Sequence, residues 1–558
     1  MKKVKNKLNL TFIAIFYLLL IFVVISTSSI VFVIGGHISK YMFIFDYALS
    51  IYIMYKFYGK KMETKNFIEN IVIASFIFFV LCFIALIYYD CSWDGNIYHK
   101  QMIGLMKNGM NPVYNLISGD LWARHYANGS EIWGAELYAF FNNIEVGKVI
   151  NLLLSFSLYV IAYNYLYRKT NKKLISNLFA FAITFNPIML YQFHTYYIDG
   201  VVAASLFLTI IGLLNVIDGK QNFDDKENYI MLAASIVICV NSKFTALLLC
   251  MMFAGLLGGF TIIYNFIKKN YKFAWKYLIY LGVVFSFAVA IVGSSTYVKN
   301  TVEFGSPFYP LIGEGAVDIN SDNEPKSFKN MNHMEKWLYA TFSETYTWYD
   351  KNPKLKVPFT VSKSEMYSLE FPDIRIGGLG VWYSGMLIIS SIVLVGALII
   401  LIIKKSKQFW TVSLLLAGII IPIPILPVVW QARYYPEIYL IPFIAIVVLV
   451  ASKKKSIKGL SYLLVLLAVG NGLFLFPQAF KKIENSINVN KDLIYLAEQS
   501  QTKKVIMSQD NYTFYGAYYN YIDKGIEYEY EDERMENGIP IYYGSLYRFE
   551  EDNEEEEE

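Results

Sequence analysis

Long apolar stretches separated by short polar connections dominate the chain from residue 8 to about residue 476. A helix needs roughly 20 mostly apolar residues to cross the ~30 Å hydrocarbon core of a membrane. On that rule the pattern predicts about thirteen membrane-spanning helices, with approximate centres at residues 20, 49, 78, 157, 182, 208, 237, 258, 286, 393, 419, 444 and 467. The stretch from Tyr41 to Tyr58 is short and carries Asp46. The fold class predicted is an α-helical polytopic membrane protein.

The positions of Lys and Arg predict how the chain is oriented. Positive residues in short connections favour the cytoplasmic side. The clusters concerned are residues 2–7, 56–65, 168–173, 268–276, 404–407 and 453–458. Alternation then places residues 90–147, 299–380 and everything after Pro477 outside. We therefore expect a multi-pass protein of the cell membrane with a cytoplasmic N-terminus and an extracytoplasmic C-terminus. The apolar run from Leu8 to Ile34 is longer than that of a signal peptide and is interpreted as a retained span.

The segments predicted to lie outside have structure of their own. Tyr98, Met102, Leu105 and Met106 recur at helical spacing after Asp94, which predicts an amphipathic helix lying flat on the membrane. Further helices are expected at residues 131–141 and 334–346. Residues 504–507 and 539–543 are strand-like, so residues 477–550 are predicted to form a small α/β appendage. Residues 1–476 would then be the transmembrane domain, and the Glu-rich residues 551–558 a disordered tail.

Composition excludes several other classes of protein. Hydrophobic residues make up 56% of the 558 residues and charged residues only 17%, which is too much apolar surface for one soluble core. The net charge of +4 is small, and the Lys residues fall in short clusters between apolar runs and form no single basic face, so no nucleic-acid partner is expected. Of the four Cys residues only Cys91 lies in a polar segment, which indicates neither a disulfide framework nor a zinc site. No nucleotide-binding loop or serine nucleophile elbow occurs in a suitable context.

Asp94 is the first candidate for chemistry, because it follows a predicted span and stands beside Trp93. A carboxylate at a partly desolvated interface has a raised pKa and can accept a proton from a hydroxyl or amine. The alternative is that Asp94 caps the following helix, and spacing alone does not separate the two.

Four further polar residues are predicted at the same depth: His99, Arg124, His125 and His194. Arg and His side chains can donate hydrogen bonds to a phosphate, although single interfacial residues of these types often only extend among lipid headgroups. Metal binding by Asp94, His99, His125 and Glu131 lacks a characteristic ligand spacing, so no metal cofactor is favoured.

Two cations stand at the predicted outer ends of apolar runs. Lys243 interrupts one run, where a charge needs a partner, either a lipid phosphate or a carboxylate such as Asp199. Arg433 could bind a phosphate or pair with Glu437. Tyr197 and Asp199 form the predicted turn between two spans on the same side.

Short motifs follow one another in order between about residues 70 and 450. They are Trp93-Asp94-Gly95 with Tyr98-His99, Gly109-x-Asn111-Pro112, His125-Tyr126 with Gly129 and Glu131, Tyr197-Ile198-Asp199-Gly200, Ser242-Lys243-Phe244-Thr245, Ser306-Pro307-Phe308-Tyr309-Pro310 and Arg433-Tyr434-Tyr435-Pro436. Together with the topology, this pattern resembles the GT-C superfamily of membrane glycosyltransferases. The resemblance is to bacterial members distantly similar to protein O-mannosyltransferases and to the aminoarabinose transferases of lipid A.

The resemblance implies a sugar transfer from a polyprenyl-phosphate donor to a glycan, lipid or protein acceptor of the cell envelope, with inversion at the anomeric carbon. Carried over, Asp94 would be the general base, Lys243 and Arg433 would hold the donor phosphate, and His99 and His125 would shape the donor pocket. Many relatives carry an acidic pair in the first outer segment, whereas here only Asp90 precedes Asp94. Two other classes remain: a lipid-linked glycan polymerase or ligase, and a polytopic lipid or glycan transporter, which would show charges near the bilayer middle.

Overall fold

The computed structural model describes residues 8–115, 120–318, 323–347, 352–452, 455–509, 514–542 and 544–550. Each of the thirteen predicted span centres falls in a helical segment of this part of the chain. These are α1 (Leu10–Val33), α2 (Met42–Tyr58), α3 (Thr64–Ile87), α7 (Val149–Thr170), α8 (Lys173–Thr184), α10 (Asp199–Asp218), α11 (Lys226–Val240), α12 (Phe244–Phe253) continued by α13 (Gly259–Ile267), α14 (Tyr271–Phe287), α19 (Tyr383–Ile403), α20 (Lys407–Ile420), α22 (Leu440–Val450) and α23 (Lys455–Leu473).

Nine helical segments among the described residues are long and apolar enough to cross a membrane. α8 and α22 are apolar but shorter, and α2 and α11 have only 17 and 15 residues. The protein is therefore a mostly helical multi-pass membrane protein, as the sequence predicted, while the count of thirteen crossings stays a prediction.

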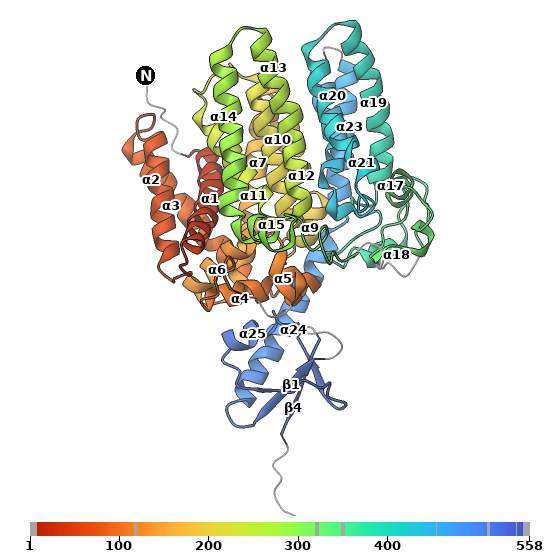
Figure 1. Cartoon of the computed structure of the whole chain (residues 1–558). Helices are drawn as coiled ribbons and strands as arrows, with labels where there is room; N and C mark the ends of the chain where they lie inside the picture. The colour runs from red at the N-terminus through yellow and green to blue at the C-terminus, as the bar shows by residue number, and fades with distance from the viewer. Residues whose placement is uncertain are drawn as a thin grey trace, which may run out of the picture.

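The helices form an upright bundle (Figure 1). Apolar residues lie both in its interior and on its outer surface. In the apolar stretch of α10, 94% of the residues are buried, whereas in that of α19 only 22% are buried. A helix that is apolar all round and buried belongs to the interior, and one that keeps its apolar side chains exposed suits a lipid environment. α1 and α10 are thus central helices, and α3, α14 and α19 are peripheral.

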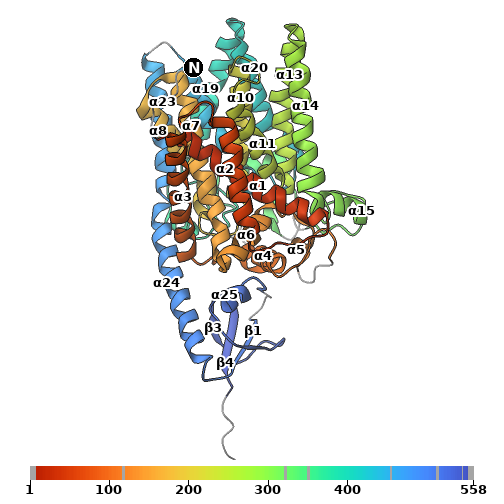
Figure 2. The ribbon, with the colours of Figure 1, turned by 90° about the vertical axis from the view of Figure 1, so that its left-hand side faces the viewer.

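Short helices gather at one end of the bundle, which we call the lower end after its place in Figure 1. They are α4 (Lys100–Lys107), α5 (Leu121–His125), α6 (Gly129–Phe141), α9 (Pro187–Gln192), α15 (Lys299–Phe304), α17 (His333–Thr341), α18 (Lys363–Ser368) and α21 (Pro422–Ile425). Met102, Ile103 and Met106 of the predicted amphipathic helix are buried and belong to a cluster shared with α6. The basic α13–α14 and α19–α20 connections lie at the opposite end (Figure 2).

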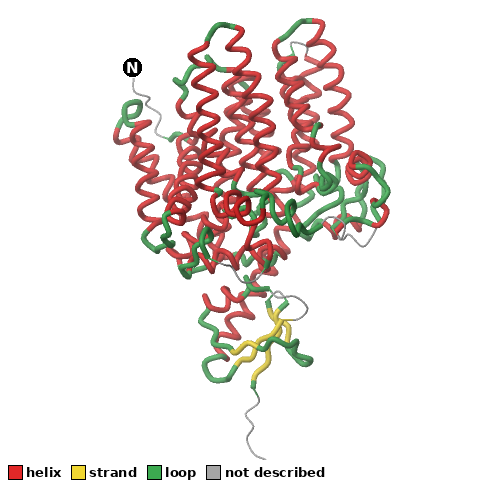
Figure 3. The backbone as a smooth tube through the Cα atoms, in the orientation of Figure 1, coloured by secondary structure: helices red, strands yellow, loops and turns green. Residues whose placement is uncertain are grey.

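A C-terminal unit, residues 476–550, lies below the bundle and contains a four-stranded sheet (Figure 3). α24 (Phe476–Gln499) leads into β1 (Val505–Gln509), α25 (Tyr518–Asp523), β2 (Glu529–Tyr530), β3 (Ile539–Ile541) and β4 (Ser545–Phe549). The strand order is β2-β1-β4-β3, with β1 parallel to β2 and the other pairs antiparallel. Leu493, Leu496 and Met507 lie in its core. The predicted acidic tail, residues 551–558, lies outside the described residues.

Candidate functional site

Four breaks between helices meet at the lower end and bring distant charges together. Asp94 follows α3, Asp199 begins α10, Lys243 stands between α11 and α12, and Arg433 lies in the 3-10 turn Ala432–Tyr434. All four are residues that the sequence selected. They form one cluster because their segments end at the same depth of the bundle.

Arg433 is the centre of this cluster. Its Nη1 atom lies 3.4 Å from Oδ2 of Asp94 and 3.7 Å from Oδ2 of Asp199, and its Nε atom lies 3.0 Å from Oδ1 of Asp373. Nη2 donates a hydrogen bond of 3.0 Å to the Tyr434 hydroxyl. The carboxylates that surround this buried guanidinium hold the pKa of Arg433 well above its usual value. Arg433 therefore stays charged. Its carboxylate partners are Asp94, Asp199 and Asp373, and not Glu437, which the sequence had suggested as a partner.

Lys243 forms a buried ion pair with Asp199. The ammonium donates to Oδ1 of Asp199 and also lies 3.5 Å from the centre of the Tyr434 ring. The second oxygen of Asp199 accepts a hydrogen bond of 2.8 Å from Gln192. Of the two partners predicted for Lys243, the carboxylate is thus the one that the structure shows. Such a pair offsets the cost of burying each charge alone.

The break that presents Lys243 is stabilised by its neighbours. Asn241 donates hydrogen bonds of 3.0 Å to the carbonyls of Val237 and Ala288, and Ser242 donates one of 2.6 Å to the carbonyl of Ile238. The Ser242 hydroxyl thereby satisfies the carbonyl of Ile238, which the Ser242 backbone would have paired in an unbroken helix. The Ser242 backbone donates instead to the carbonyl of Cys239. The interruption at membrane depth is therefore a stable feature.

Asp94 does not cap the helix that follows it. It adopts helical backbone angles, with φ −59° and ψ −36°, and makes no side-chain capping hydrogen bond to the π-helical turn Gly95–His99. The capping interpretation is wrong for this reason. The side chain is 21% exposed and faces Arg433. Burial raises the pKa of Asp94, and the nearby Arg433 guanidinium opposes that shift. A carboxyl with a raised pKa is a better proton acceptor than one in water.

The aromatic residues selected from the sequence have different surroundings. The Arg433 guanidinium lies 5.1 Å from the ring centre of Tyr197. The ring of Tyr98 lies 4.2 Å from that of His99, and burial raises the pKa of Tyr98 well above its usual value. Trp93 is partly exposed and packs edge-on against Phe514 of the C-terminal unit at 5.1 Å.

The histidines and Arg124 have other surroundings. His99 is buried and its Nδ1 contacts Oε1 of Glu131. Nδ1 of His125 lies 3.0 Å from Oδ1 of Asn300, and burial lowers the pKa of His125. Arg124 is exposed. His125 and Arg124 thus differ from Lys243 and Arg433, because the structure records no ion pair between either of them and the described carboxylates of the cluster.

His194 and Asp90 serve local packing. His194 stacks on Tyr88 with ring centres 3.9 Å apart, and burial lowers its pKa to about 3. The carboxylate of Asp90 accepts hydrogen bonds from the backbone of Ser92 at 2.8 Å and Tyr196 at 2.9 Å. Within the described parts of the chain, no group of three or more His, Cys, Asp or Glu residues is arranged to hold a metal ion.

Sequence reasoning missed two partners of the cluster, Asp373 and Gln192, and named Tyr434 only within the motif Arg433-Tyr434-Tyr435-Pro436. Asp373 also pairs with Arg375, Oδ2 to Nη2 at 2.9 Å. Asp373 lies within a long segment that joins α15 to α19, and no periodicity marks it. Tyr434 directly follows the selected residue Arg433 in the sequence, and this adjacency could have indicated that it belongs to the cluster.

The arrangement combines a partly exposed carboxyl with two buried cations. A carboxyl of raised pKa can accept a proton, and cations within a few ångströms can stabilise an anion that forms beside it. The class that fold and site define is a multi-pass membrane protein with a charged cluster at one end of its helix bundle.

Comparison with known proteins also indicates a membrane protein. Residues 144–352 match a family described as "Predicted membrane protein (DUF2142)", a match that covers less than half of the chain. It includes Asp199 and Lys243 but neither Asp94 nor Arg433. No curated protein matches the chain in sequence. A crystal structure of ArnT from Cupriavidus metallidurans bound to undecaprenyl phosphate aligns with a TM-score of 0.41 and 11% identity, over 81% of this chain and 84% of the other.

Proposed function

We propose that the protein is a glycosyltransferase that moves a sugar from a polyprenyl-phosphate donor to an acceptor of the cell envelope, on the extracytoplasmic side. The observation that carries the proposal is the contact between Asp94 and Arg433, with 3.4 Å between Oδ2 and Nη1. A carboxyl that can accept a proton thus lies directly beside a permanent cation at the lower end. Transfer from a phosphate carrier needs both.

In the proposed reaction an acceptor hydroxyl or amine attacks the anomeric carbon as Asp94 takes its proton. The bond from that carbon to the phosphate oxygen breaks, and polyprenyl phosphate leaves with the electron pair. Protonation removes the negative charge of Asp94 next to Arg433 at the moment when the leaving phosphate gains charge. Arg433 can then exchange one anionic partner for the other, and Lys243 adds positive potential from behind Asp199.

The test is an assay in membranes with a labelled polyprenyl-phosphate sugar, which compares the wild type with Asp94→Asn. Asn has the same shape but cannot accept the proton, so we expect the transfer rate to fall by roughly 10²-fold or more. The matched control is Asp120→Asn. Asp120 caps α5 by accepting a hydrogen bond of 2.8 Å from the Trp122 backbone, a role that Asn retains.

Two outcomes would overturn the proposal. One is an Asp94→Asn variant, equally abundant in the membrane, that transfers sugar at the normal rate. The other is transfer of only a preassembled glycan chain, which would instead identify a polymerase or ligase.

A further inference from the structure

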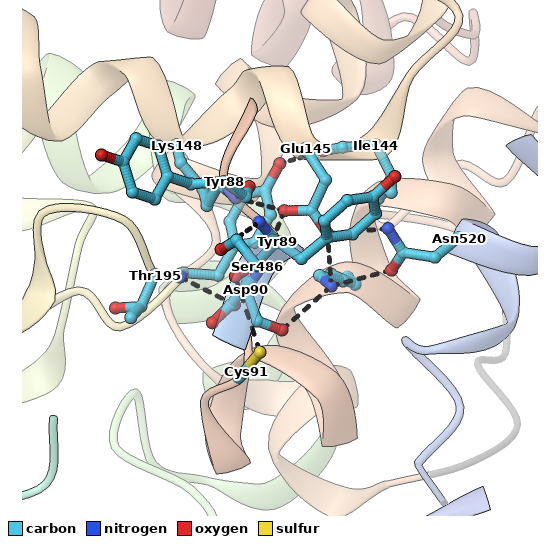
Figure 4. A network of polar contacts seen from close by, with 12 residues as sticks. Tyr88, Tyr89, Asp90, Cys91, Ile144, Glu145, Lys148, Thr195, Ser486 and Asn520 are labelled. Atoms are coloured by element: carbon cyan, nitrogen blue, oxygen red, sulfur yellow. Dashed lines mark hydrogen bonds and ion pairs between the residues drawn. The ribbon is translucent and has the colours of Figure 1, made fainter. Parts of the chain in front are cut away.

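A buried network of polar contacts joins the C-terminal unit to the chain between α3 and α7 (Figure 4). Lys100, at the start of α4, is fully buried. Its ammonium donates to Oε1 of Glu145 at 2.7 Å and to Oδ1 of Asn96 at 3.1 Å. From the C-terminal unit it contacts Oδ1 of Asn520 at 2.9 Å and the hydroxyl of Tyr542 at 2.7 Å. Half of these four contacts therefore come from a unit more than 400 residues away in sequence.

Charged groups of both signs meet in this network. Lys100 and Lys148 both pair with Glu145, and the Asp90 carboxylate lies beside them, held by backbone donors. Asn520 also donates to Oε1 of Glu145 at 2.7 Å. A buried ammonium that loses acceptors is costly, because no water replaces them. The C-terminal unit thus completes the surroundings of Lys100.

The same contacts hold the turn that carries Asp94. Asn96 closes this turn by donating to the carbonyls of Asp90 at 2.7 Å and Ser92 at 2.8 Å. Tyr542 donates to the carbonyl of Asp90 and lies 3.2 Å from Oδ1 of Asn96. The backbone of Gly516 donates to the carbonyl of Asn96 at 2.7 Å. The C-terminal unit therefore holds the turn on both sides of Asp94.

Close packing accompanies these hydrogen bonds. The ring of Tyr519 lies directly against Gly104, where an added Cβ would fall 2.0 Å from the ring. A Cβ at Gly516 would fall 2.7 Å from the carbonyl oxygen of Asn96 and from Cβ of Lys100. Glycine at both positions permits an approach that any larger residue would prevent. The contact is an intimate one and not a loose tether.

We propose that the C-terminal unit positions the catalytic carboxylate, with Asn520 and Tyr542 as positioning residues that act through Lys100 on the turn of Asp94. This inference rests on the proposed function and deepens it. The small appendage expected from the sequence becomes a part of the active site, since Asp94 can face Arg433 only while the turn is held. A displacement of about 1 Å at a reacting group can lower a rate by 10²-fold.

The variants Tyr542→Phe and Asn520→Ala test the inference in the full-length protein. Tyr542→Phe retains the ring and removes only the hydroxyl. We expect kcat for sugar transfer to fall by roughly tenfold to 10²-fold in both, with KM for the donor within about twofold. Arg548→Ala is the matched control. Arg548 belongs to the same unit and forms an exposed ion pair with Glu531, 2.9 Å apart, so its loss should change neither value.

Cys91 provides a second readout that does not depend on activity. It is half-buried against the core of the C-terminal unit, and burial raises its thiol pKa to about 12. The other three cysteines are buried. Alkylation by a membrane-impermeant maleimide should be about tenfold faster in Tyr542→Phe and Asn520→Ala, because the turn opens more often. Cys91→Ser gives the background and Arg548→Ala should label as slowly as the wild type.

The two readouts separate this inference from the proposed function. Unchanged labelling and unchanged kcat in both variants would overturn the inference. Faster labelling of Cys91 with an unchanged kcat would also overturn it, because the turn could then open without any effect on sugar transfer. Faster labelling in a protein that transfers no sugar at all would support the held turn and refute the proposed function.

Discussion

Nη1 of Arg433 lies 3.4 Å from Oδ2 of Asp94, although the two residues are 339 positions apart in the sequence. The contact joins the segment that follows α3 to one that lies beyond α20. It makes the charge state of one residue depend on the other. The first predictions concern this dependence.

The pH dependence of transfer should report the pair. Burial raises the pKa of Asp94 and Arg433 lowers it, so removing the cation moves this pKa further up. A base works only when deprotonated, and therefore Arg433→Gln should shift the acidic limb of kcat/KM to higher pH than in the wild type. The measurement is the normalised pH profile of each protein. A limb that stays in place or moves to lower pH would contradict the assignment.

The two arginines selected from the sequence should differ in importance. Arg433→Lys keeps the charge but loses the fork that contacts three carboxylates, and we expect the transfer rate to fall by roughly 10²-fold. Arg124→Ala should stay within about twofold of the wild type, because Arg124 is exposed. Rates measured at equal protein abundance in membranes check both. A large fall in the transfer rate of Arg124→Ala would instead indicate that Arg124 takes part in binding the donor.

The buried pair of Lys243 and Asp199 predicts a rescue. Asp199→Ala leaves a buried ammonium without its carboxylate and should lower the free energy of unfolding by about 3–5 kcal/mol. Adding Lys243→Met removes the uncompensated charge and should recover most of that loss. Thermal unfolding of the detergent-purified single and double variants tests this. Additive losses in the double variant would show that the two residues are not coupled.

Asp523 predicts a pH dependence in the interface of the C-terminal unit. Its carboxylate accepts hydrogen bonds of 2.6 Å from the Tyr138 hydroxyl and from the backbone of Ile144. Burial raises its pKa from 3.8 to about 6. The folded protein thus holds the proton more tightly than the unfolded chain, so stability is lost as the pH rises from about 4 to about 6.

Asp523→Asn should remove this loss. The amide can still accept from Ile144 and donate to Tyr138, and it does not ionise. We expect the free energy of unfolding of the variant, measured relative to that of the wild type, to be about 2 kcal/mol higher at about pH 7.5 than at about pH 4.5. Thermal unfolding at the two pH values provides the comparison. An equal effect of the substitution at both pH values would show that Asp523 does not titrate in this range.

The fold could be predicted well because it depends on local patterns. Each predicted span centre falls in a helical segment, since a run of apolar residues has few alternatives to a helix in a membrane. The strands near residues 505 and 540 were predicted from short strand-like pieces between Tyr-rich polar residues. Crossings by short helices such as α8 and α11 depend on neighbours and on lipid, which the sequence does not specify.

The candidate site could be predicted only in part. Asp94, Asp199, Lys243 and Arg433 were selected because charges at the ends of apolar runs are unusual, and the structure brings them together. Asp373 was missed because it lies in a long polar segment where a carboxylate is ordinary. Excluding the helix cap for Asp94 required its backbone angles, and those depend on the turn that Lys100 and Asn96 hold.

By itself, the sequence determined that this chain is a helical membrane protein and that its unusual charges occur at the ends of spans. Hydrophobic period and length are local properties, so they survive without a structure. Only the tertiary structure decided which charges meet and that the C-terminal unit surrounds Lys100, since contacts across hundreds of residues arise from helix packing. The physical reason is that burial makes each charge find a partner, and packing determines which partner is within reach.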